Sequence, residues 1–536
     1  MGLIFKVART EHELDQIHRL NYATFVEEIP QHSSSESKLL IDKYHTENTY
    51  LICMKDDQLV GMLAVRDQRP FSIDQKIGRV EEQLPVKSTC PCEIRLLTVK
   101  KEHRNGRIFL GLSQLLANYC LRNGYDVGVI SGTTRQIKLY EQIGFIPFHH
   151  LVGTESAMYQ PMYMTREIFE KGILKRLGTK VYSFLPGPTE IEDRVKKAFP
   201  VSHRSQKFRT VLANVQMKLS KMMNAEYSQV LLGSGSLAND VIVNQMRKEG
   251  KGLILVNGEF GQRLVIHAER AGVDFVALEW IWGESYVEDD ILKVLERYDI
   301  KWVWMVHCET STGMLNSLEF VKGICKGNEL KLCVDCISSI GSVPISLEDV
   351  FLASGVSGKA IGAYTGLSFV FHHHQVDIDM SIPGYLDLGH YFQNESVPYS
   401  HSSNLIDALL MALELIETTK HFERIKEQYD FIRSALKEND IPILTDERSS
   451  SPTILTIPLP VHIPSKYIGD DMSIHGYLIH YESGYLNKQN WIQISPIGYV
   501  SKKTTEEMIK RLLALRTYYE RSHSEVIEKR KLTCLK

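Results

Sequence analysis

The sequence has 536 residues, which is too long for one hydrophobic core, so we expect two or three domains. Hydrophobic residues make up 43% of the chain and charged residues 24%, values typical of a soluble globular protein. The net charge of −3 gives no electrostatic reason to expect a nucleic acid or an anionic membrane as a partner.

Cysteine usage and the absence of long apolar runs favour a cytoplasmic protein. The nine cysteines are scattered and odd in number, which speaks against a disulfide framework and for a reducing compartment. Residues 1–20 lack the cationic start and long apolar core of a secretory signal. No window approaches the roughly 20 apolar residues that a membrane helix requires. We therefore expect a cytoplasmic location, no membrane span and no nucleic-acid partner.

Residues 1–170 form the first predicted domain, in which helices and strands alternate. The predicted helices are 11–28, 109–123 and 135–143, and the predicted strands are 49–54, 59–66, 93–99 and 127–130. Gly124 and Gly144 follow two of these helices, at the position where a left-handed residue often ends a helix. The alternation predicts an α/β domain. Residues 171–180 are expected to be a linker.

Residues 181–400 form the second predicted domain. Short apolar strands alternate there with helical stretches; the strands are 229–232, 252–256, 275–278, 302–307 and 330–334. This order predicts a mostly parallel, doubly wound sheet. A long helix at 404–418 opens a smaller α/β domain over 401–520, whose last helix is 505–518. Residues 521–536 read as a charged tail.

Lys359 and Asp335 occur in an arrangement that pyridoxal 5'-phosphate (PLP) chemistry requires. Asp335 ends an apolar run, and Lys359 follows on a loop of small residues, 354–358. A lysine amine can bond to the cofactor aldehyde, while a carboxylate beside the ring nitrogen keeps the ring an electron sink. The same lysine would then carry a proton between Cα and C4′, for which its pKa must be lowered. Many lysines follow loops of small residues, so the spacing alone is a weak signal, and the surrounding segments support a PLP site with Lys359 and Asp335 as catalytic residues.

Seven segments resemble the class V aminotransferases of PLP fold type I, and they occur in the family's order. They are 185–190, 202–208, 233–236, 257–263, 307–313, 334–341 and the loop around Lys359. The similarity is closest to the alanine–glyoxylate, serine–glyoxylate and 2-aminoethylphosphonate branch and covers residues 180–520. It implies a PLP-dependent transaminase with a large domain and a small C-terminal domain.

The resemblance also implies roles for single residues. Ser234, Gly235 and Ser236 occupy the phosphate-binding positions, at a strand-to-helix turn where amides and hydroxyls can hold an anion. Phe260 falls where the family stacks an aromatic ring on the pyridine. Thr310 falls where a hydroxyl touches the phenolic oxygen of the cofactor.

Two further positions imply a homodimer with shared active sites. In the family, the residues at Tyr399 and Ser402 reach the phosphate held by the neighbouring subunit. If this chain follows the pattern, one subunit completes the cofactor site of the other.

The chain departs from the family at two positions. Gly358 stands where glutamine or another polar residue usually precedes the lysine. Gln493 stands where the family has an arginine that grips the substrate carboxylate with two hydrogen bonds, which a neutral amide cannot replace. We therefore expect either a substrate without an α-carboxylate in the usual place, or replacement of that arginine by Arg204 or Arg263.

Residues 1–160 resemble the GNAT acyltransferase superfamily. The local match is 138–145, where Tyr140 takes the position of a tyrosine that protonates the leaving thiolate. Segment 93–99 is similar to a strand of the acyl-homoserine-lactone and N-acyl amino acid synthases. The pyrophosphate loop is degraded, since Arg107 and Phe109 stand at its small-residue positions. This disfavours acetyl-CoA and leaves open acyl carrier protein as the donor, or a domain without catalysis.

The sequence thus predicts a PLP-dependent aminotransferase for a small amine or amino acid, fused to a GNAT-like domain that N-acylates an amine. One alternative is a PLP lyase or desulfurase, which would need a mobile nucleophilic cysteine on a loop. Another is an aminotransferase with a GNAT module that only binds. No metal site is expected at residues 372–374, because consecutive side chains on an extended chain point apart.

Overall fold

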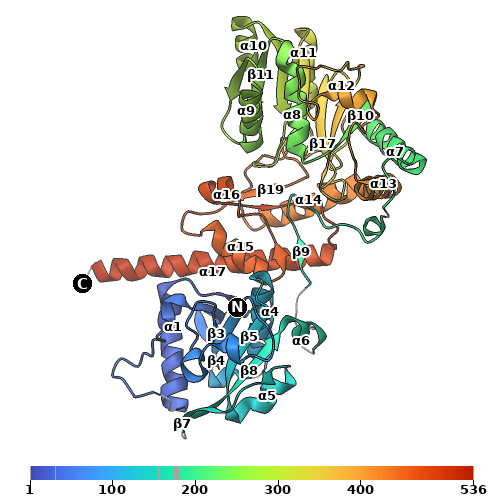
Figure 1. Cartoon of the computed structure of the whole chain (residues 1–536). Coiled ribbons are helices and arrows are strands. Elements are labelled where there is room, and N and C mark those ends of the chain that lie inside the picture. Colours follow the sequence, from blue (N-terminus) through green and yellow to red (C-terminus); the bar gives the residue numbers. More distant parts are fainter. Residues whose placement is uncertain are drawn as a thin grey trace. The chain divides into compact units, whose positions relative to one another are not determined.

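The computed structural model describes residues 2–29, 32–104, 106–154, 157–172, 180–198 and 200–534 (Figure 1). It divides the chain into two compact units, each assembled from separate stretches of sequence. The first unit contains Met1–Val181, Asp470–Tyr477 and Arg511–Lys536; the second contains Tyr182–Gly469 and Leu478–Lys510. The predicted linker 171–180 ends next to this boundary, and its residues 173–179 lie outside the described part.

The first unit contains an eight-stranded sheet. Its strands are β1 (Ile4–Val7), β2 (Thr49–Lys55), β3 (Gln58–Arg66), β4 (Pro91–Val99), β5 (Val127–Thr133), β6 (Ile146–Pro147), β7 (Val152–Thr154) and β8 (Ala157–Thr165). They follow the order β1-β2-β3-β4-β5-β8-β6, and β7 also pairs with β8. β4 and β5 are parallel neighbours, whereas β2, β3 and β4 are joined by antiparallel pairing. The α/β prediction for this region is confirmed.

The helices of the first unit begin with α1, which starts at a capping box formed by Thr10 and Glu13. They are α1 (Glu11–Tyr22), α2 (Asp74–Ile77), α3 (Val80–Gln83), α4 (Arg107–Arg122), α5 (Ile137–Gln142) and α6 (Arg166–Lys171), with 3₁₀ turns at His45–Glu47, Lys101–His103 and Thr134–Gln136. A π-helix, Ala23–Glu28, continues directly from α1. The single helix predicted over 11–28 is therefore two helices of different pitch.

Strands β4 and β5 separate along their length. They pair only over Pro91–Glu93 and Val127–Val129, the first part of β4. Beyond that point β4 has Leu96 at φ 53°, and its pairing with β3 shifts register. A bulge of this kind bends a strand and redirects its side chains. The second half of β4 is thus unpaired on the β5 side.

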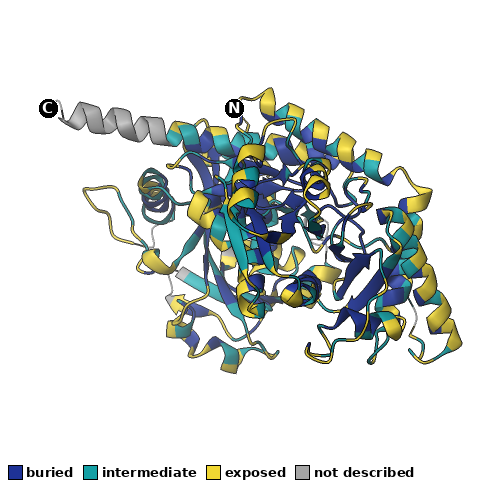
Figure 2. Ribbon diagram, turned by 90° about the horizontal axis from the view of Figure 1, so that it is seen from above, coloured by how far each residue is buried: buried dark blue, intermediate teal, exposed yellow. Residues whose placement is uncertain are grey.

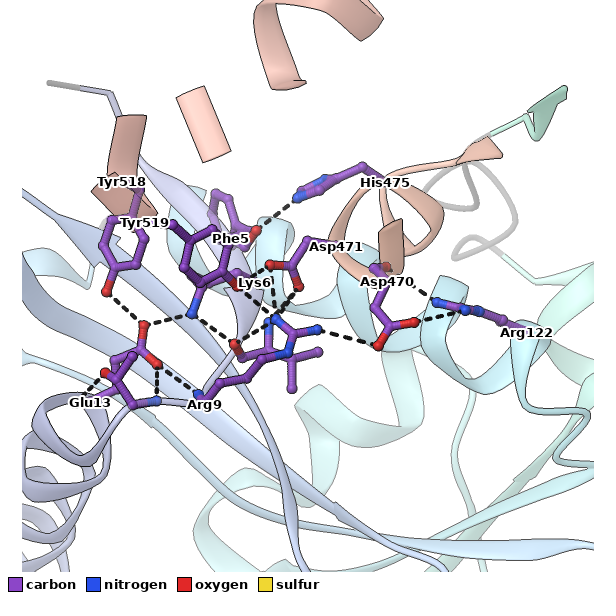
Figure 3. Close-up of polar contacts among 12 residues, drawn as sticks. Phe5, Lys6, Arg9, Glu13, Arg122, Asp470, Asp471, His475, Tyr518 and Tyr519 are labelled. Carbon is purple, nitrogen blue, oxygen red and sulfur yellow. Dashed lines mark hydrogen bonds and ion pairs between the residues drawn. The ribbon is translucent and has the colours of Figure 1, made fainter. Parts of the chain in front are cut away.

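Two segments from the far end of the sequence complete the first unit. α15 (Ser465–Ile474) and α17 (Lys502–Cys534) each begin in the sequence of the second unit and end in that of the first, whereas β20 (Tyr477–Leu478) begins in the first and ends in the second. Asp471 accepts a hydrogen bond from Arg9 Nη1 at 2.9 Å, and the Tyr518 hydroxyl donates one to Glu13 at 2.7 Å (Figure 3). The first unit therefore depends on residues more than 400 positions away from its N-terminal strand.

Lys6 lies at the centre of this buried cluster. Its side chain is 0% exposed, and its Nζ donates hydrogen bonds to Glu13 at 2.5 Å and to the main-chain oxygen of Val7 at 2.8 Å. The rings of Tyr518 and Tyr519 lie 5.1 and 4.8 Å from the same nitrogen. Burial lowers the pKa of Lys6, and the nearby Glu13 carboxylate opposes this. The charge is thus buried but paired.

The second unit contains a seven-stranded sheet. Its strands are β10 (Tyr227–Leu232), β11 (Lys251–Val256), β12 (Phe275–Glu279), β13 (Ile300–Val306), β16 (Lys331–Asp335), β17 (Leu352–Val356) and β18 (Leu367–His372). The order is β10-β18-β17-β16-β13-β11-β12. The five strands from β17 to β12 are parallel, and β18 runs antiparallel to both of its neighbours. The prediction of a mostly parallel sheet is confirmed.

Helices cover both faces of this sheet. Alternate residues of a strand point to opposite faces, so Leu253 packs in one core cluster and Ile254 in another. The first cluster contains residues of α7 (Gln206–Met223), α11 (Leu318–Gly327) and α13 (Ser403–Thr418); the second contains residues of α8 (Gly235–Gln245), α9 (Glu259–Ala271) and α12 (Leu388–Gln393). In Figure 2 buried residues fill the strands and exposed residues lie on the outer helix faces. This is the doubly wound arrangement that the sequence predicted.

The remaining elements of the second unit are short apart from α14. They are β9 (Tyr182–Ser183), α10 (Glu288–Arg297), β14 (Cys308–Glu309), β15 (Met314–Leu315), α14 (His421–Lys437), β19 (Leu455–Pro458), α16 (Gly484–Gln489) and β21 (Trp491–Ile494), with 3₁₀ turns at Val195–Lys197 and Met246–Lys248. The last helix, predicted over 505–518, is part of α17 and extends to Cys534. The predicted tail 521–536 therefore starts inside a helix. Over the described residues, we find no helix that could span a membrane.

Candidate active site

Lys359 and Asp335 lie near the carboxyl ends of neighbouring parallel strands of the second unit. Asp335 is the last residue of β16, and Lys359 follows shortly after β17. The Lys359 Nζ donates a hydrogen bond to Ser338 Oγ at 2.7 Å and lies 5.4 Å from the centroid of the Phe260 ring. Binding sites of open parallel sheets lie at this edge. The structure brings the predicted lysine, carboxylate and aromatic ring together there.

Asp335 is a buried carboxylate with two hydrogen-bond donors. It is 5% exposed; Oδ2 accepts from Asn239 Nδ2 and Oδ1 from the main-chain N–H of Ile337, both at 2.8 Å. Burial raises the pKa of Asp335, while these two donors and the positive Lys359 oppose that rise. An ionised carboxylate in such a place is best stabilised by a cation opposite to it.

Lys359 has the environment of a lysine that gives up its proton readily. Burial lowers its pKa, and the negative charge of Asp335 opposes this. Its partner Ser338 also lies 2.5 Å from the hydroxyl of Thr310. The amine, Ser338 and Thr310 therefore form one hydrogen-bonded chain, which includes the hydroxyl residue predicted to touch the cofactor.

The predicted phosphate turn joins β10 to α8. Ser234 is the N-cap of α8, and Gly235 is its first residue. A Cβ atom at Gly235 would lie 2.6 Å from Ile337 Cδ1, so the close approach requires glycine. The free N–H groups of the first helical turn, together with the hydroxyl of Ser236, make this turn suitable for a phosphate.

These groups line one cavity, and together they fit PLP. Ser236 lies at the helix N-terminus, Asp335 at the strand end, and Phe260 and Ser338 also line the cavity. A cofactor with a phosphate, an aromatic ring, a basic ring nitrogen and an aldehyde finds a partner for each in this set with Lys359. Among the described residues, no group of three or more histidine, cysteine or acidic side chains could hold a metal ion.

Glu309 belongs to the site and was not singled out in the sequence. It is 0% exposed and accepts hydrogen bonds from the main-chain N–H groups of Phe260 and Gly261 and from the hydroxyl of Ser311. Burial raises the pKa of Glu309, and these donors oppose the rise. Its position next to Thr310, inside a predicted motif, was the available signal. The Glu309 carboxylate fixes the start of α9, which carries Phe260.

Gln493 is buried under the active site. It is 0% exposed; its Nε2 donates to the main-chain oxygens of Thr310 at 2.7 Å and Ser311 at 3.0 Å, and to Thr456 Oγ1 at 2.8 Å. Its Oε1 accepts from Tyr485. The amide group is thus fully used inside the protein, where it supports the turn after β14 that carries Thr310.

The two arginines considered as replacements occupy different places. Arg204 is exposed in the turn before α7 and does not line the cavity. Arg263 does line the cavity, where its guanidinium lies 4.8 Å from the centroid of the Phe260 ring and 3.2 Å from Glu259.

Tyr399 and Ser402 do not line the cavity. The Tyr399 ring stacks on Tyr385, with centroids 4.2 Å apart. Ser402 is the N-cap of α13, and its hydroxyl accepts a hydrogen bond from the Leu405 N–H. The contact of Tyr399 and Ser402 with a neighbouring subunit stays a prediction.

In the first unit, Tyr140 packs against β5. A Cβ atom at Gly132 would lie 2.9 Å from its ring, and its hydroxyl donates to Gln136 at 2.9 Å. Burial raises the pKa of Tyr140. A tyrosine with a raised pKa stays protonated at neutral pH, as a proton donor must.

The degraded pyrophosphate loop carries an internal ion pair. The guanidinium of Arg104 forms two hydrogen bonds to the carboxylate of Glu28, at 2.5 and 2.6 Å, and one to the main-chain oxygen of Val99. Gly106 precedes α4 at φ 81°, so the turn itself has the shape that glycine permits. Arg104 is therefore already neutralised by a residue of the π-helix.

A buried polar cluster lies beside the unpaired half of β4. The Arg95 guanidinium pairs with Asp42 through two hydrogen bonds of 2.9 and 3.0 Å, and Glu93 accepts from the main-chain N–H of Ile73. The guanidinium of Arg66 lies 3.8 Å from the Tyr44 ring centroid. Several polar atoms here are buried without a partner: His18 Nδ1, Tyr44 hydroxyl and Asn48 Oδ1. Of these residues, the sequence motifs pointed only to those of β4, within segment 93–99.

Comparison with known proteins finds two family matches. Residues 194–404 match the model for aminotransferase class V, and residues 16–166 match that for the N-acyl amino acid synthase FeeM. Both agree with the resemblances drawn from the sequence motifs.

Individual relatives match the second region. An uncharacterized aminotransferase of Methanocaldococcus jannaschii is 28% identical over 309 residues, 53% of this chain and 80% of the relative. A 2-aminoethylphosphonate–pyruvate transaminase of Pseudomonas fluorescens is 31% identical over 197 residues, 35% of this chain and 53% of the relative, so that match spans about half of the relative. The crystal structure of an alanine–glyoxylate aminotransferase from Nostoc sp. has a TM-score of 0.57 at 26% identity and covers 63% of this chain and 95% of its own. The comparisons therefore support a PLP-dependent transaminase whose residues 194–404 are similar to class V aminotransferases and whose residues 16–166 are similar to N-acyl amino acid synthases.

Proposed function

We propose that the second unit transfers an amino group between a small amine or amino acid and a keto acceptor at Lys359. PLP, when bound, supplies the electron sink for the negative charge that develops at the substrate Cα. Asp335 would hold the ring nitrogen through its carboxylate, and Phe260 would contact the ring. Lys359 would take the proton from the substrate Cα and carry it to the cofactor, which its lowered pKa favours.

One observation carries this proposal: the Lys359 Nζ lies 2.7 Å from Ser338 Oγ and beside Phe260, in the unit where Asp335 is buried. A buried lysine and a buried carboxylate cost stability unless a bound group uses them. Ser338 and Thr310 hold the amine at the position from which it can reach the substrate carbon.

The test is to map the cofactor attachment. Borohydride reduction of the purified protein followed by peptide mass spectrometry should find the cofactor on Lys359. Lys322 is a suitable internal control, because it is also buried but is engaged by Glu319 and the main-chain oxygen of Ser346. Lys359→Ala should abolish transamination. An adduct on another lysine, or none, would refute the assignment.

The amino donor is proposed to carry an anchor other than the usual forked α-carboxylate contact. Gln493 stands at the family's arginine position, and its amide is fully used by protein groups. The related Pseudomonas transaminase is named for a substrate with a phosphonate group. A phosphonate, a sulfonate or an acyl tail would fit a site in which Arg263 is the arginine that lines the cavity.

For the first unit we propose amine acylation from an acyl-CoA or an acyl carrier protein, with Tyr140 as the proton donor. The separation of β4 from β5 and the unpartnered polar atoms near Tyr44 support a binding function for this unit. Mass spectrometry of products, after incubation with amine pools and each acyl donor, tests it. If Tyr140→Phe transferred the acyl group at an unchanged rate, Tyr140 would not be the proton donor. If the protein bound neither acyl donor, the first unit would be a module without catalysis.

Among the described residues that line the cavity, none is a cysteine suited to the desulfurase alternative. Cys308 lines the cavity, but it lies in a buried strand, and burial raises its pKa to about 11. A thiol in that state is a weak nucleophile and cannot swing toward a substrate. Release of sulfide from cysteine would nevertheless restore this alternative.

A cytoplasmic homodimer is proposed as the working form. Its basis is the positions of Tyr399 and Ser402, which in the family reach the neighbouring subunit. Sedimentation equilibrium would give the mass, and mixing Lys359→Ala with Tyr399→Phe protein should restore part of the activity if sites are shared. A monomer with full activity would refute it.

A further inference from the structure

Helices α8 and α9 line the inner wall of the cofactor cavity. On α8, Ser236 and Asn239 are three residues apart and therefore lie on one face. On α9, Phe260 and His267 are seven residues apart and likewise share a face. All four line the cavity. Ser236 and Phe260 have the roles that the motifs imply, whereas Asn239 and His267 have none.

Asn239 makes a direct contact with the carboxylate that faces the cofactor. Its Nδ2 donates to Asp335 Oδ2 at 2.8 Å, and both side chains are 5% exposed. A carboxylate only accepts hydrogen bonds, so the NH₂ group of the amide faces Asp335. This donor stabilises the ionised form and disfavours the protonated form. It also fixes one oxygen, which orients the carboxylate.

The other end of the same amide is unsatisfied. Asn239 Oδ1 is buried without a hydrogen-bond partner, as is Trp304 Nε1 on β13. Leaving an amide oxygen unpaired costs free energy that an apolar side chain of the same size would not incur. A leucine would therefore pack at this position about as well as Asn239. The polar group of Asn239 is used only for its hydrogen bond to Asp335.

His267 gives a second polar group on the same wall. Its Nδ1 donates to the Asp240 carboxylate at 2.6 Å, which leaves Nε2 as the ring nitrogen for the cavity side. Asp240 is the neighbour of Asn239 in α8. His267 lowers the pKa of Asp335, in the same direction as the amide.

We propose that Asn239 is a positioning residue of the transaminase: its amide keeps Asp335 ionised and turned toward the ring nitrogen of PLP. The proposal rests on the cofactor assignment, and it concerns cofactor binding before any amino-group transfer. It predicts that the loss of Asn239 matters only for a cofactor that has a ring nitrogen.

The test compares PLP with an analogue in which C–H replaces the ring nitrogen. Equilibrium binding to the apoprotein is measured for wild type, Asn239→Leu and the control Asn244→Leu. Asn244 is also buried in α8, but its amide donates to the main-chain oxygen of Asp240, away from the carboxylate. Asn239→Leu should weaken PLP by about 10- to 100-fold, the effect of one hydrogen bond to a charged group. Binding of the analogue should not change, and Asn244→Leu should change neither.

A spectroscopic measurement checks the same point without turnover. The ¹⁵N chemical shift of ring-labelled PLP should move toward the unprotonated value in Asn239→Leu and stay unchanged in Asn244→Leu. Equal weakening of both cofactors would mean a purely structural role and would overturn the proposal, as would unchanged binding of both. If Asn239→Leu does not fold, the smaller Asn239→Ser allows the same comparison. Normal cofactor behaviour without amino transfer would instead contradict the proposed function.

Discussion

Glu309 accepts hydrogen bonds from the main-chain N–H groups of Phe260, at 3.1 Å, and Gly261, at 2.9 Å. The carboxylate therefore caps the first turn of α9 and fixes the ring beside Lys359. The space is tight, since a Cβ atom at Gly258 would lie 2.4 Å from Glu309 Cδ. The position of the Phe260 ring, which is proposed to stack on the cofactor, thus depends on a buried acid in the neighbouring segment.

Replacing this acid tests the dependence. In Glu309→Gln the new NH₂ group faces main-chain donors and leaves one of them unpaired, so we expect a loss of about 1–3 kcal/mol in unfolding free energy. PLP affinity should fall as well. All five tryptophans belong to the second unit, so tryptophan fluorescence in urea follows this unit by itself. Glu296→Gln, at an exposed position of α10, is the control. Unchanged stability would show that the cap is dispensable.

Asp335→Asn tests the partner of the ring nitrogen. A neutral amide cannot hold the positive charge there, so we expect the half-reaction with an amino donor to slow by about 2–5 kcal/mol in barrier. Stopped-flow absorbance measures the rate. Asp349→Asn, in an exposed pair with Lys326, should react like wild type. Near-normal rates in Asp335→Asn would mean that another group holds the ring nitrogen.

The sequence predicted the site where it depends on local order along the chain. Asp335 and Gly235 could be found because each stands at a strand end or a helix start, which a run of apolar residues marks. Asn239 and Glu309 acquire their roles only through contacts with residues 96 and 48 positions away. No run of apolar residues marks either of them, and the one signal for Glu309 is that it stands next to Thr310 inside a family motif.

The fold shows the same limit. The strands of the parallel sheet were recognisable because both faces are buried, as in Val303 and Trp304, which makes their sequences continuously apolar. The assembly of the first unit could not be predicted, because Arg9 and Asp471 pair across 462 positions. A charged residue in a helix usually lies in solvent, and only the tertiary structure reveals that Asp471 does not.

The buried pair of Lys6 and Glu13 should behave as a unit. Lys6→Met leaves the Glu13 charge buried without its cation, which we expect to cost about 3–5 kcal/mol. Adding Glu13→Gln removes that charge and keeps an acceptor for the N–H groups of Arg9 and Thr10, so the double variant should recover part of the loss. Hydrogen exchange of the β1 amides reports on the first unit. Additive losses would show that the two side chains act independently.

Acid should destabilise the second unit through His421. This side chain is 2% exposed and donates to the main-chain oxygen of Gly341, and burial lowers its pKa to about 4. The unfolded chain takes up a proton near pH 6.5. Between these values the unfolded state binds more protons, so stability falls as the pH is lowered, by at most about 1.4 kcal/mol per pH unit for one group. His421→Gln should flatten this slope in tryptophan fluorescence. An unchanged slope would assign it to other groups.

The choice of amino donor provides the last prediction and follows from Gln493. An arginine that forks onto a substrate carboxylate is worth roughly 2–5 kcal/mol where the charge pair is buried. Here the amide instead holds the main-chain oxygens of Thr310 and Ser311. We therefore expect weak reaction with alanine and stronger reaction with amines that carry a phosphonate or sulfonate group.

Half-reactions with a panel of amino donors decide between these cases, and the loss of the cofactor absorbance measures each reaction. Arg263→Gln should weaken the anionic donors, because this arginine lines the cavity, whereas Arg204→Gln should not. Gln493→Leu should slow all donors alike, since it frees Thr310 rather than removing a substrate contact. Fast, saturable reaction with alanine that Arg263→Gln abolishes would show that Arg263 has taken over the carboxylate. If Gln493→Leu lost reaction with one donor and kept reaction with the others, Gln493 would contact the substrate.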